Sequence, residues 1–355
     1  MKKISLCMIV KDEEKVIERC LDSVRDIVDE IIIVDTGSKD KTKQIASQYT
    51  DKIYDFNWVE DFSKARNFSF SKATKDYILW LDADDVFLEE DREKFKKLKE
   101  ELDGHIDVYM FKYNYSFDEN GNAILVQNRE RLLKRENNYK WVSPIHEVIV
   151  PTGKIKDTNI YVTHKKEEVK DVNRNLKIFE KMRENGIILD DRQQYCYAKE
   201  LYFLNKTEEA IYEYRNFIDT YKSNYKQEEY LLYQAILELS DCYKRKEEME
   251  QELDTLMLIL KNQIPKPECL CRIGDVFIRK KCYKEAIYWF ELALESKEIE
   301  PNIDYKSFIP YISLGVCYFW LNDKAKAEYY NELAGKIKPK DKTYLENKRI
   351  YERQE

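Results

Sequence analysis

The amino-acid pattern changes character near residue 170, and this change limits the chain to two kinds of structure. Before that point, short apolar runs alternate with segments in which apolar residues recur at the helical period. This alternation predicts a Rossmann-like α/β domain with a mostly parallel sheet. From about Asp171 onward, Gly and Pro become rare and the whole pattern is helical. A length of 355 residues also favours two domains.

The apolar runs place the expected elements along the chain. Strands are expected at 4–10, 30–34, 51–56 and 77–81, with helices at 13–28 and 41–49. Later strands at 108–115, 123–127 and 160–164 fit an antiparallel extension of the sheet. We expect the α/β domain to span residues 1–168, followed by a helical linker at 169–190, helical repeats at 191–345 and a polar tail at 346–355.

The helical region contains a repeated pattern of small and aromatic residues. Gly274 and Gly315 are each followed by an aromatic residue at offset 3 and by Ala at offsets 12 and 19. A weaker copy begins at Ala198, and a degenerate one opens at Leu239. Small residues let paired helices approach closely, and a pair that cannot bury its own apolar face must stack on its neighbours. The pattern predicts tetratricopeptide-like repeats rather than an ordinary helical bundle.

Composition and charge argue against several classes of protein. The 61 basic and 68 acidic residues are interspersed, whereas a nucleic-acid binder needs a clustered basic face. No apolar run approaches the roughly 20 residues that span a bilayer. The first residues lead directly into a strand-like run and not into a secretory signal. With 8 scattered cysteines that read as reduced, buried thiols, we expect a cytoplasmic protein.

The sharpest chemical signal is Asp82-Ala83-Asp84-Asp85, directly after an apolar run. Residues i and i+2 of a strand point the same way, so Asp82 and Asp84 can face one cation. Carboxylate oxygens suit Mg²⁺ or Mn²⁺, which also bind substrate phosphates. Such an ion neutralises the charge that develops on a diphosphate leaving group. The sequence therefore predicts a Mn²⁺ or Mg²⁺ site at this strand end.

A second carboxylate, Asp35, ends another apolar strand and precedes a tight Gly-Ser turn at Ser38. Open α/β sheets bind ligands at the carboxyl ends of their strands. Asp35 at that edge can accept hydrogen bonds from a nucleobase imide or a ribose. The alternative is a strand-to-helix turn in which Asp35 is only a cap, and the residues alone leave both open.

Four motifs in chain order resemble the family 2 glycosyltransferases of the GT-A fold. They are the opening strand with its acidic turn at 4–14, the Asp-x-Gly-Ser turn at Asp35, Ala65-Arg66-Asn67, and the strand that bears the Asp82-Ala83-Asp84 motif. The resemblance is closest to the subgroup with a tetratricopeptide tail, which includes the peptide S-glycosyltransferases that modify glycocin bacteriocins. It implies an inverting hexosyltransferase that uses a nucleotide diphosphate sugar, with UDP-sugars favoured.

The resemblance also implies roles for single residues. The nucleotide sugar would contact Val10, Asp12, Glu13, Asp35, Ser38, Arg66, Asp82 and Ala83. The metal would be held by Asp82, Asp84 and His164, because such enzymes often take a late histidine as third ligand. Glu147 is the leading candidate for the base that deprotonates the acceptor. His146 would orient Glu147, contact substrate or itself be the base.

Other possibilities stay open at this point. Nucleotidyl transfer also uses strand-end carboxylates and a metal, but it usually needs a Gly-rich phosphate loop, and the 8 glycines form none near the N-terminus. A non-catalytic tetratricopeptide adaptor would be expected to have lost part of the site. The helical repeats would position a peptide, protein or glycan acceptor, and a homodimer through the ends of the array stays open. Arg129, Arg131 and Arg135 would steady the diphosphate or simply be solvated.

Overall fold

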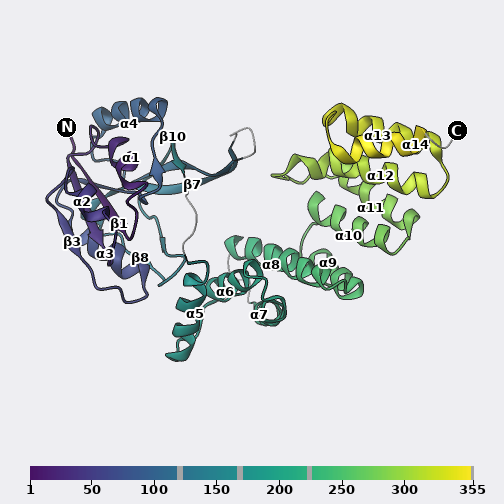
Figure 1. Ribbon diagram of the computed structural model, residues 1–355, viewed down its shortest axis with the longest axis horizontal. Coiled ribbons are helices and arrows are strands. Elements are labelled where there is room, and N and C mark those ends of the chain that lie inside the picture. Colours follow the sequence, from purple (N-terminus) through teal and green to yellow (C-terminus); the bar gives the residue numbers. More distant parts are fainter. Residues whose placement is uncertain (118–122, 166–170, 222–225, 353–355) are drawn as a thin grey trace. The chain divides into compact units, whose positions relative to one another are not determined.

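The computed structural model describes residues 1–117, 123–165, 171–221 and 226–352. The chain divides into two compact units, Met1–Asn185 and Gly186–Glu355, which are treated separately (Figure 1). The first unit continues past residue 168, where we expected the α/β domain to end. It includes helix α5 (Arg174–Glu184), which lies in the segment expected as a linker.

The first unit is a sheet covered by helices on both faces. Its strands are β1 (Ile4–Val10), β2 (Glu30–Asp35), β3 (Ile53–Asp55), β4 (Tyr77–Trp80), β5 (Asp85–Val86), β6 (Val108–Phe117), β7 (Ala123–Lys134), β8 (Trp141–Val142), β9 (Val148–Ile149) and β10 (Ile155–His164). Its other helices are α1 (Ile17–Asp22), α2 (Thr42–Ala46), α3 (Phe62–Lys72) and α4 (Glu89–Glu101). The expected α/β class is confirmed, although α1 is shorter than the predicted segment 13–28.

Eight of these strands form one sheet in the order β3-β2-β1-β4-β7-β6-β10-β5. Strands β3, β2, β1 and β4 are all parallel. Strand β7 is antiparallel to both neighbours, as the expected extension requires. The expectation is wrong for β10, which runs parallel to β6 and pairs antiparallel only with the short β5. The sheet is therefore mixed, with a parallel half that carries the first motifs.

The parallel strands are buried on both faces because each face has its own apolar core. Side chains of Ile4, Leu6 and Met8 on β1 pack with α1 and α4 on one face. Cys7, on the alternate side of β1, packs with α3 and the β8–β9 hairpin on the other, where Phe70 of α3 belongs to the same core. Burial on both faces explains why β1 and β2 read as continuous apolar runs. It also leaves the strand ends as the place for polar residues.

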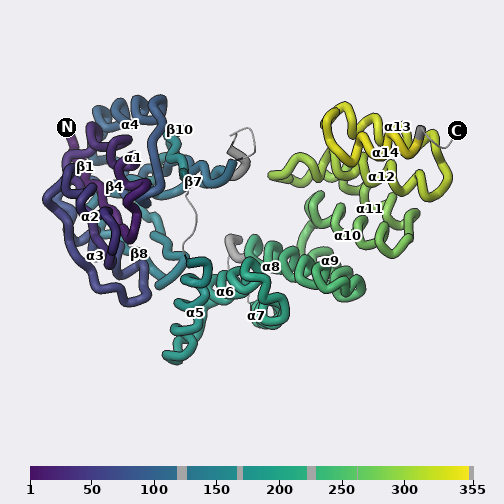
Figure 2. Tube along the Cα trace, viewed as in Figure 1, coloured from purple at the N-terminus to yellow at the C-terminus, as the bar shows by residue number. Residues whose placement is uncertain are grey.

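The second unit consists of antiparallel helix pairs, each turning back beside the helix before it (Figure 2). The helices are α6 (Asp191–Phe203), α7 (Thr207–Thr220), α8 (Lys226–Arg245), α9 (Met249–Asn262), α10 (Pro267–Arg279), α11 (Tyr283–Glu295), α12 (Phe308–Trp320), α13 (Lys324–Ile337) and α14 (Lys342–Glu352). Ala210, Ala286 and Ala327, equivalent in the predicted repeats, are all 0% exposed. The tetratricopeptide-like pattern is thus confirmed by the close helix contacts that it predicted.

Two parts of the second unit differ from the simple pattern. The segment expected as a polar tail is helical as far as Glu352, and Tyr351 stacks on Phe319 at 5.0 Å between ring centroids. In the degenerate repeat, Ser240 takes the small-residue position, so Glu252, at offset 12 from it, takes the position of the buried alanines and is 3% exposed. Its carboxylate pairs with Arg279 at 2.5 Å, so an ion pair replaces an apolar contact there.

Within the described residues, none of the helices combines the length and the apolarity that crossing a bilayer requires.

Replacing Gly274 by Ala should destabilise the second unit. An added Cβ would lie 2.7 to 3.0 Å from three atoms of the Phe290 ring. Such overpacking costs roughly 1–3 kcal/mol, against a gain of about 1 kcal/mol in helix propensity. We expect a net loss of about 1 kcal/mol in the free energy of unfolding, measured by urea denaturation. Phe290→Leu added to Gly274→Ala should recover part of the loss in a double-mutant cycle, and strictly additive losses would contradict the proposed contact.

Candidate active site

A buried ion pair shapes the acidic turn that follows β4, formed by residues 82–85. Asp85 is 0% exposed and pairs with Arg131 of β7, also 0% exposed, at 2.9 Å between Oδ2 and the guanidinium. The same guanidinium donates to the Trp80 carbonyl at 3.2 Å, and the Asp82 backbone N–H donates to Asp85 Oδ2 at 3.1 Å. The turn is therefore fixed from its buried side. Its two other carboxylates, on Asp82 and Asp84, remain 36% and 25% exposed.

Three side chains at this edge come close enough to hold one metal ion. Ligand atoms of Asp84, Asp85 and His164 all lie within 4.8 Å of one another. The backbone brings His164 here because β10 pairs with β5, opposite Asp85. His164 Nδ1 is 3.5 Å from an oxygen of each carboxylate, which is too long for a good hydrogen bond. Nδ1 and Asp85 Oδ1 are both buried without a hydrogen-bond partner.

This donor set fits a divalent cation of the predicted kind. The two carboxylates suit Mn²⁺ or Mg²⁺, and the imidazole nitrogen is an acceptable further ligand for Mn²⁺. An ion between the two buried atoms without partners would satisfy both of them. Asp84 and His164 are expected ligands, whereas Asp85 is not. Asp82, which we expected as a ligand, lies outside the group, and its Oδ1 accepts a hydrogen bond from Arg66 at 2.7 Å.

The two carboxylates also determine the charge on His164. Burial lowers the pKa of His164, but Asp84 and Asp85 outweigh burial and raise it to about 9. The imidazole also stacks on the Tyr115 ring, with 5.5 Å between centroids and 4° between planes. In the absence of a cation, His164 is therefore protonated at neutral pH, and a metal ion must displace that proton.

Asp35 lies at the carboxyl end of β2, directly beside Val10 of β1. It is 2% exposed, and its Oδ1 accepts hydrogen bonds from the backbone N–H groups of Gly37 and Ser38, both at 2.9 Å. Its Oδ2 is buried without a partner. The two sequence interpretations therefore apply to different oxygens, because Oδ1 caps the turn and Oδ2 is left for another donor.

The loops after β1 and β2 hold each other in place. The Asp12 backbone N–H donates to Ser38 Oγ at 2.9 Å, and Asp12 Oδ1 accepts from the Lys39 N–H at 2.7 Å. The Glu13 N–H donates to Thr42 Oγ1 at 2.7 Å. Asp12 has a left-handed backbone, with φ of 55°. The structure thus brings Asp12, Glu13 and Ser38 together at one edge of the sheet, close to the end of β2.

Arg66, on α3, joins the acidic turn to a second loop. Its guanidinium donates to Asp82 Oδ1 at 2.7 Å and to Glu147 Oε1 at 2.6 Å. Burial lowers the pKa of Arg66, but the two carboxylates outweigh it and raise the pKa above its ordinary value. Burial likewise raises the pKa of Asp82, while Arg66 and Arg131 lower it to about 2. Arg66 and Asp82 are therefore both charged at neutral pH.

The loop that carries His146 and Glu147 joins β8 to β9 and is held by α3. Asn67 forms two hydrogen bonds with the Trp141 backbone. Its Nδ2 donates to the Trp141 carbonyl at 2.9 Å, and its Oδ1 accepts from the Trp141 N–H at 3.0 Å. The Phe62 N–H donates to the Pro144 carbonyl at 2.8 Å. His146 is left-handed, with φ of 51°, and its ring lies 6.0 Å from that of Phe179 on α5.

The three arginines of the segment before this loop lie in different environments. Arg131 is the buried partner of Asp85, with its guanidinium 3.8 Å from the Trp80 ring centroid. Arg129 lies 5.1 Å from the same ring and is 28% exposed, and burial lowers its pKa. Arg135 donates to the Lys75 carbonyl at 2.6 Å, before the start of β4. Of the three, Arg129 is therefore the one placed to approach a ligand at the strand ends.

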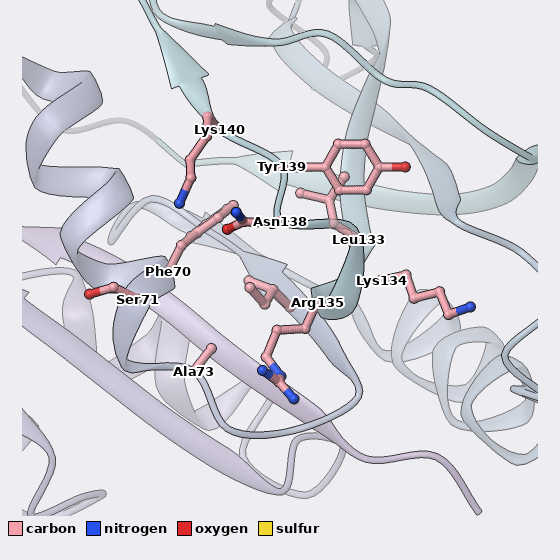
Figure 3. Close-up of a pocket in the computed structure, with 10 residues that line it drawn as sticks. Phe70, Ser71, Ala73, Leu133, Lys134, Arg135, Asn138, Tyr139 and Lys140 are labelled. Atoms are coloured by element: carbon pink, nitrogen blue, oxygen red, sulfur yellow. The ribbon is translucent and has the colours of Figure 1, made fainter.

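Two cavities in the first unit differ in what lines them. One of about 670 Å³ lies beside the candidate metal ligands, and it is lined by His164, Tyr115, Phe117 and Lys165 among others. The other, of about 170 Å³, is shown in Figure 3 and is lined by Phe70, Arg135, Asn138 and Lys140 among others. None of the residues that line the second cavity carries a carboxylate. It lies at the opposite end of β4 from the acidic turn and is separate from the site.

Residues 5–156 match the family model described as Glycosyl transferase family 2. Together with the fold and the strand-end carboxylates, this match identifies the first unit as a glycosyltransferase family 2 domain. In this chain the domain is followed by tetratricopeptide-like helical repeats.

Several curated proteins are similar over part of the chain. A TPR repeat-containing protein of Synechococcus elongatus is 47% identical over 103 residues, which are 29% of this chain and 25% of that protein. The SPbeta prophage-derived glycosyltransferase SunS of Bacillus subtilis is 29% identical over 236 residues, 62% of this chain and 54% of that protein. The chain thus spans a quarter to about half of the length of these relatives. Among solved structures, a tetratricopeptide repeat protein from Parabacteroides merdae superimposes with a TM-score of 0.42 and 17% identity, over 51% of this chain and 66% of that one.

Binding of Mn²⁺ should strengthen as the pH rises from about 6 toward about 8, because the ion competes with the proton on His164. One displaced proton gives an affinity gain of up to about tenfold per pH unit, levelling off near the metal-free pKa of about 9. Titration calorimetry at several pH values measures this slope. His105→Gln, a change at an exposed histidine, should leave it unchanged. A pH-independent affinity in the wild-type protein would contradict a role for His164 as ligand.

Proposed function

We propose that this chain transfers a sugar from a nucleotide diphosphate sugar to an acceptor, with inversion at the anomeric carbon. The observation that carries the proposal is that buried polar atoms without hydrogen-bond partners occur in two places at one edge of the sheet. They are the buried Oδ2 of Asp35 and the group of Asp84, Asp85 and His164. The first suits an N–H donor on a base, and the second suits a cation on a diphosphate.

The nucleotide end of the donor would lie over the carboxyl ends of β1 and β2. Asp35 Oδ2 would accept a hydrogen bond from a nucleobase imide such as that of uracil, which is why we favour UDP-sugars. Val10, Asp12, Glu13 and Ser38 would border the base, and Ala83 would lie beside the ribose and diphosphate. The loops that carry these residues are already bonded to each other, so little ordering is needed on binding.

The diphosphate would lie over the acidic turn. Asp84 and His164, with Asp85 behind them, would hold Mn²⁺ or Mg²⁺, and the bound ion would supply charge neutralisation for the leaving diphosphate. Asp82 would contact the ribose and the ion, and Arg66 would donate hydrogen bonds to a phosphate oxygen. Such charge-assisted bonds are among the strongest that a protein makes to phosphate.

Glu147 would accept the proton of the acceptor nucleophile. As the oxygen, sulfur or nitrogen of the acceptor attacks the anomeric carbon, its bond to that carbon forms. The bond from the carbon to the diphosphate oxygen breaks on the opposite face, and its electron pair leaves with the nucleotide diphosphate. The proton goes to Glu147 and from there to solvent. His146, next to Glu147 and stacked near Phe179, would contact the acceptor or orient the base.

The acceptor itself is proposed to be a peptide, a protein or a glycan that the helical repeats present. Stacked helix pairs offer an extended surface, and such surfaces bind polymers in many repeat proteins. The match to the relative called a glycosyltransferase covers 236 residues, more than the first unit, Met1–Asn185, contains, so it includes part of the helical region. A homodimer through the last helices is a further proposal for the same region.

Incubation with a panel of nucleotide sugars and Mn²⁺ should release a nucleotide diphosphate from one of them. Asp84→Asn should lower this rate by roughly 100-fold or more, because the cation loses a charged ligand. EDTA should have a similar effect. The matched control is Asp103→Asn, at an exposed turn where the carboxylate accepts a hydrogen bond from the His105 N–H.

Two other outcomes would decide against the proposal. Calorimetry that detects no binding of any nucleotide or nucleotide sugar would favour the adaptor function. Release of inorganic diphosphate from nucleoside triphosphates would instead indicate nucleotidyl transfer.

A further inference from the structure

Arg66 is the one residue in the described part of the site that bonds both to the acidic turn and to the loop with the candidate base. Its side chain is 11% exposed, as is that of Glu147, while Asp82 is 36% exposed. The guanidinium uses Nε for Glu147 and a terminal nitrogen for Asp82. Both partners are acidic, so donors of this guanidinium are already engaged by the protein's own carboxylates.

The position of the guanidinium is fixed by aromatic rings. Its carbon lies 5.3 Å from the Trp80 ring centroid and 4.7 Å from that of Trp141. A cation in contact with two indoles keeps its place, because moving it loses cation–π contact with both. An incoming anion therefore has to bind Arg66 where it lies. The groups that can move are the carboxylates.

The loop of Glu147 has its backbone anchored on both sides of the carboxylate. Asn67 makes two hydrogen bonds to the Trp141 backbone at the start of the loop. Val148, directly after Glu147, pairs with β8 in the β8–β9 hairpin. The backbone at Glu147 is therefore held in place without the bond to Arg66. Weakening that bond would free the side chain of Glu147 to rotate toward an acceptor and would leave the loop itself where it is.

We propose that Arg66 couples donor binding to the readiness of the acceptor base. Without donor, Arg66 holds Glu147 in an ion pair and keeps its carboxylate from the acceptor. The donor diphosphate competes for the same guanidinium, takes part of its hydrogen bonding and frees Glu147. The base is thereby released only when the diphosphate of a nucleotide, such as that of the sugar donor, is in place. This inference rests on the proposed function, because it assigns the diphosphate to Arg66.

The competition can be measured as binding, without turnover. If Glu147 competes with the diphosphate, its removal should strengthen nucleotide binding, although it abolishes transfer. We expect Glu147→Gln to lower the Kd of UDP in the presence of Mn²⁺ by roughly three- to tenfold in titration calorimetry, since a charged partner of Arg66 becomes neutral. GDP serves as the second probe in case the base pocket prefers a purine. Glu136→Gln is the matched control, since Glu136 pairs with Lys134 at 2.5 Å, away from the site, and should leave the Kd unchanged.

A double-mutant cycle separates coupling from a general change in the loop. The substitution Arg66→Lys keeps the positive charge but removes the planar guanidinium, which can bond two partners at once. Glu147→Gln should therefore have little effect on the Kd of UDP in an Arg66→Lys background. Thermal unfolding of each variant shows that it is folded, and Glu147→Ala provides a second removal of the carboxylate.

The outcomes distinguish the inference from the function on which it rests. Equal or weaker nucleotide binding in folded Glu147→Gln and Glu147→Ala would overturn the coupling and leave the proposed function standing. An effect of Glu147→Gln that is as large in the Arg66→Lys background as in the wild-type background would overturn it too. Failure of the wild-type protein to bind either nucleotide would overturn the proposed function and the coupling together.

Discussion

The ion pair between Arg131 and Asp85 is the interaction on which the site depends. Burying two charges is costly, and this pair satisfies only part of its hydrogen-bonding capacity, because Arg131 Nε, Arg131 Nη2 and Asp85 Oδ1 are buried without a hydrogen-bond partner. The Trp80 carbonyl accepts a hydrogen bond from Arg131, and the Asp82 N–H donates one to Asp85. The pair ties β7 to the end of β4, and through Asp85 it sets the short strand β5 against β10 and His164. This one buried contact thereby positions both the acidic turn and His164 at the same edge of the sheet.

Sequence reasoning can place a carboxylate at a strand end, because the local pattern shows where the apolar run stops, but it does not decide which of these carboxylates face one another. Asp35, Asp82 and Asp84 each follow an apolar run, and a carboxylate at a strand end is informative without knowledge of the neighbours. Asp85 is not singled out by its sequence, because adjacent acidic residues look alike until one of them is buried. Its partner Arg131 is distant in the chain, and the bond between them cannot be inferred from either segment alone. The bridge from Arg66 to Glu147 is hidden for the same reason.

The fold is predictable where periodicity decides it and less so where pairing does. The helical repeats are evident from small residues at fixed spacing, since packing demands Gly or Ala at those contacts. The direction of β10 is not predictable, because an apolar strand has the same pattern in a parallel or an antiparallel pair. The extent of α14 escapes prediction for another reason. Its sequence is mostly polar, and the burial of Tyr351 depends on contacts with residues distant in the chain, among them the stacked Phe319.

The pair of Glu252 and Arg279 bears on how such an array can be inherited. Glu252 lies on α9 and Arg279 on α10, so the contact crosses from one repeat to the next. A duplication or exchange that moved one of these repeats alone would bury a carboxylate with no counter-charge. The junction between these two repeats therefore constrains both of them at once, since Arg279 cannot be replaced without leaving the Glu252 carboxylate buried and unpaired.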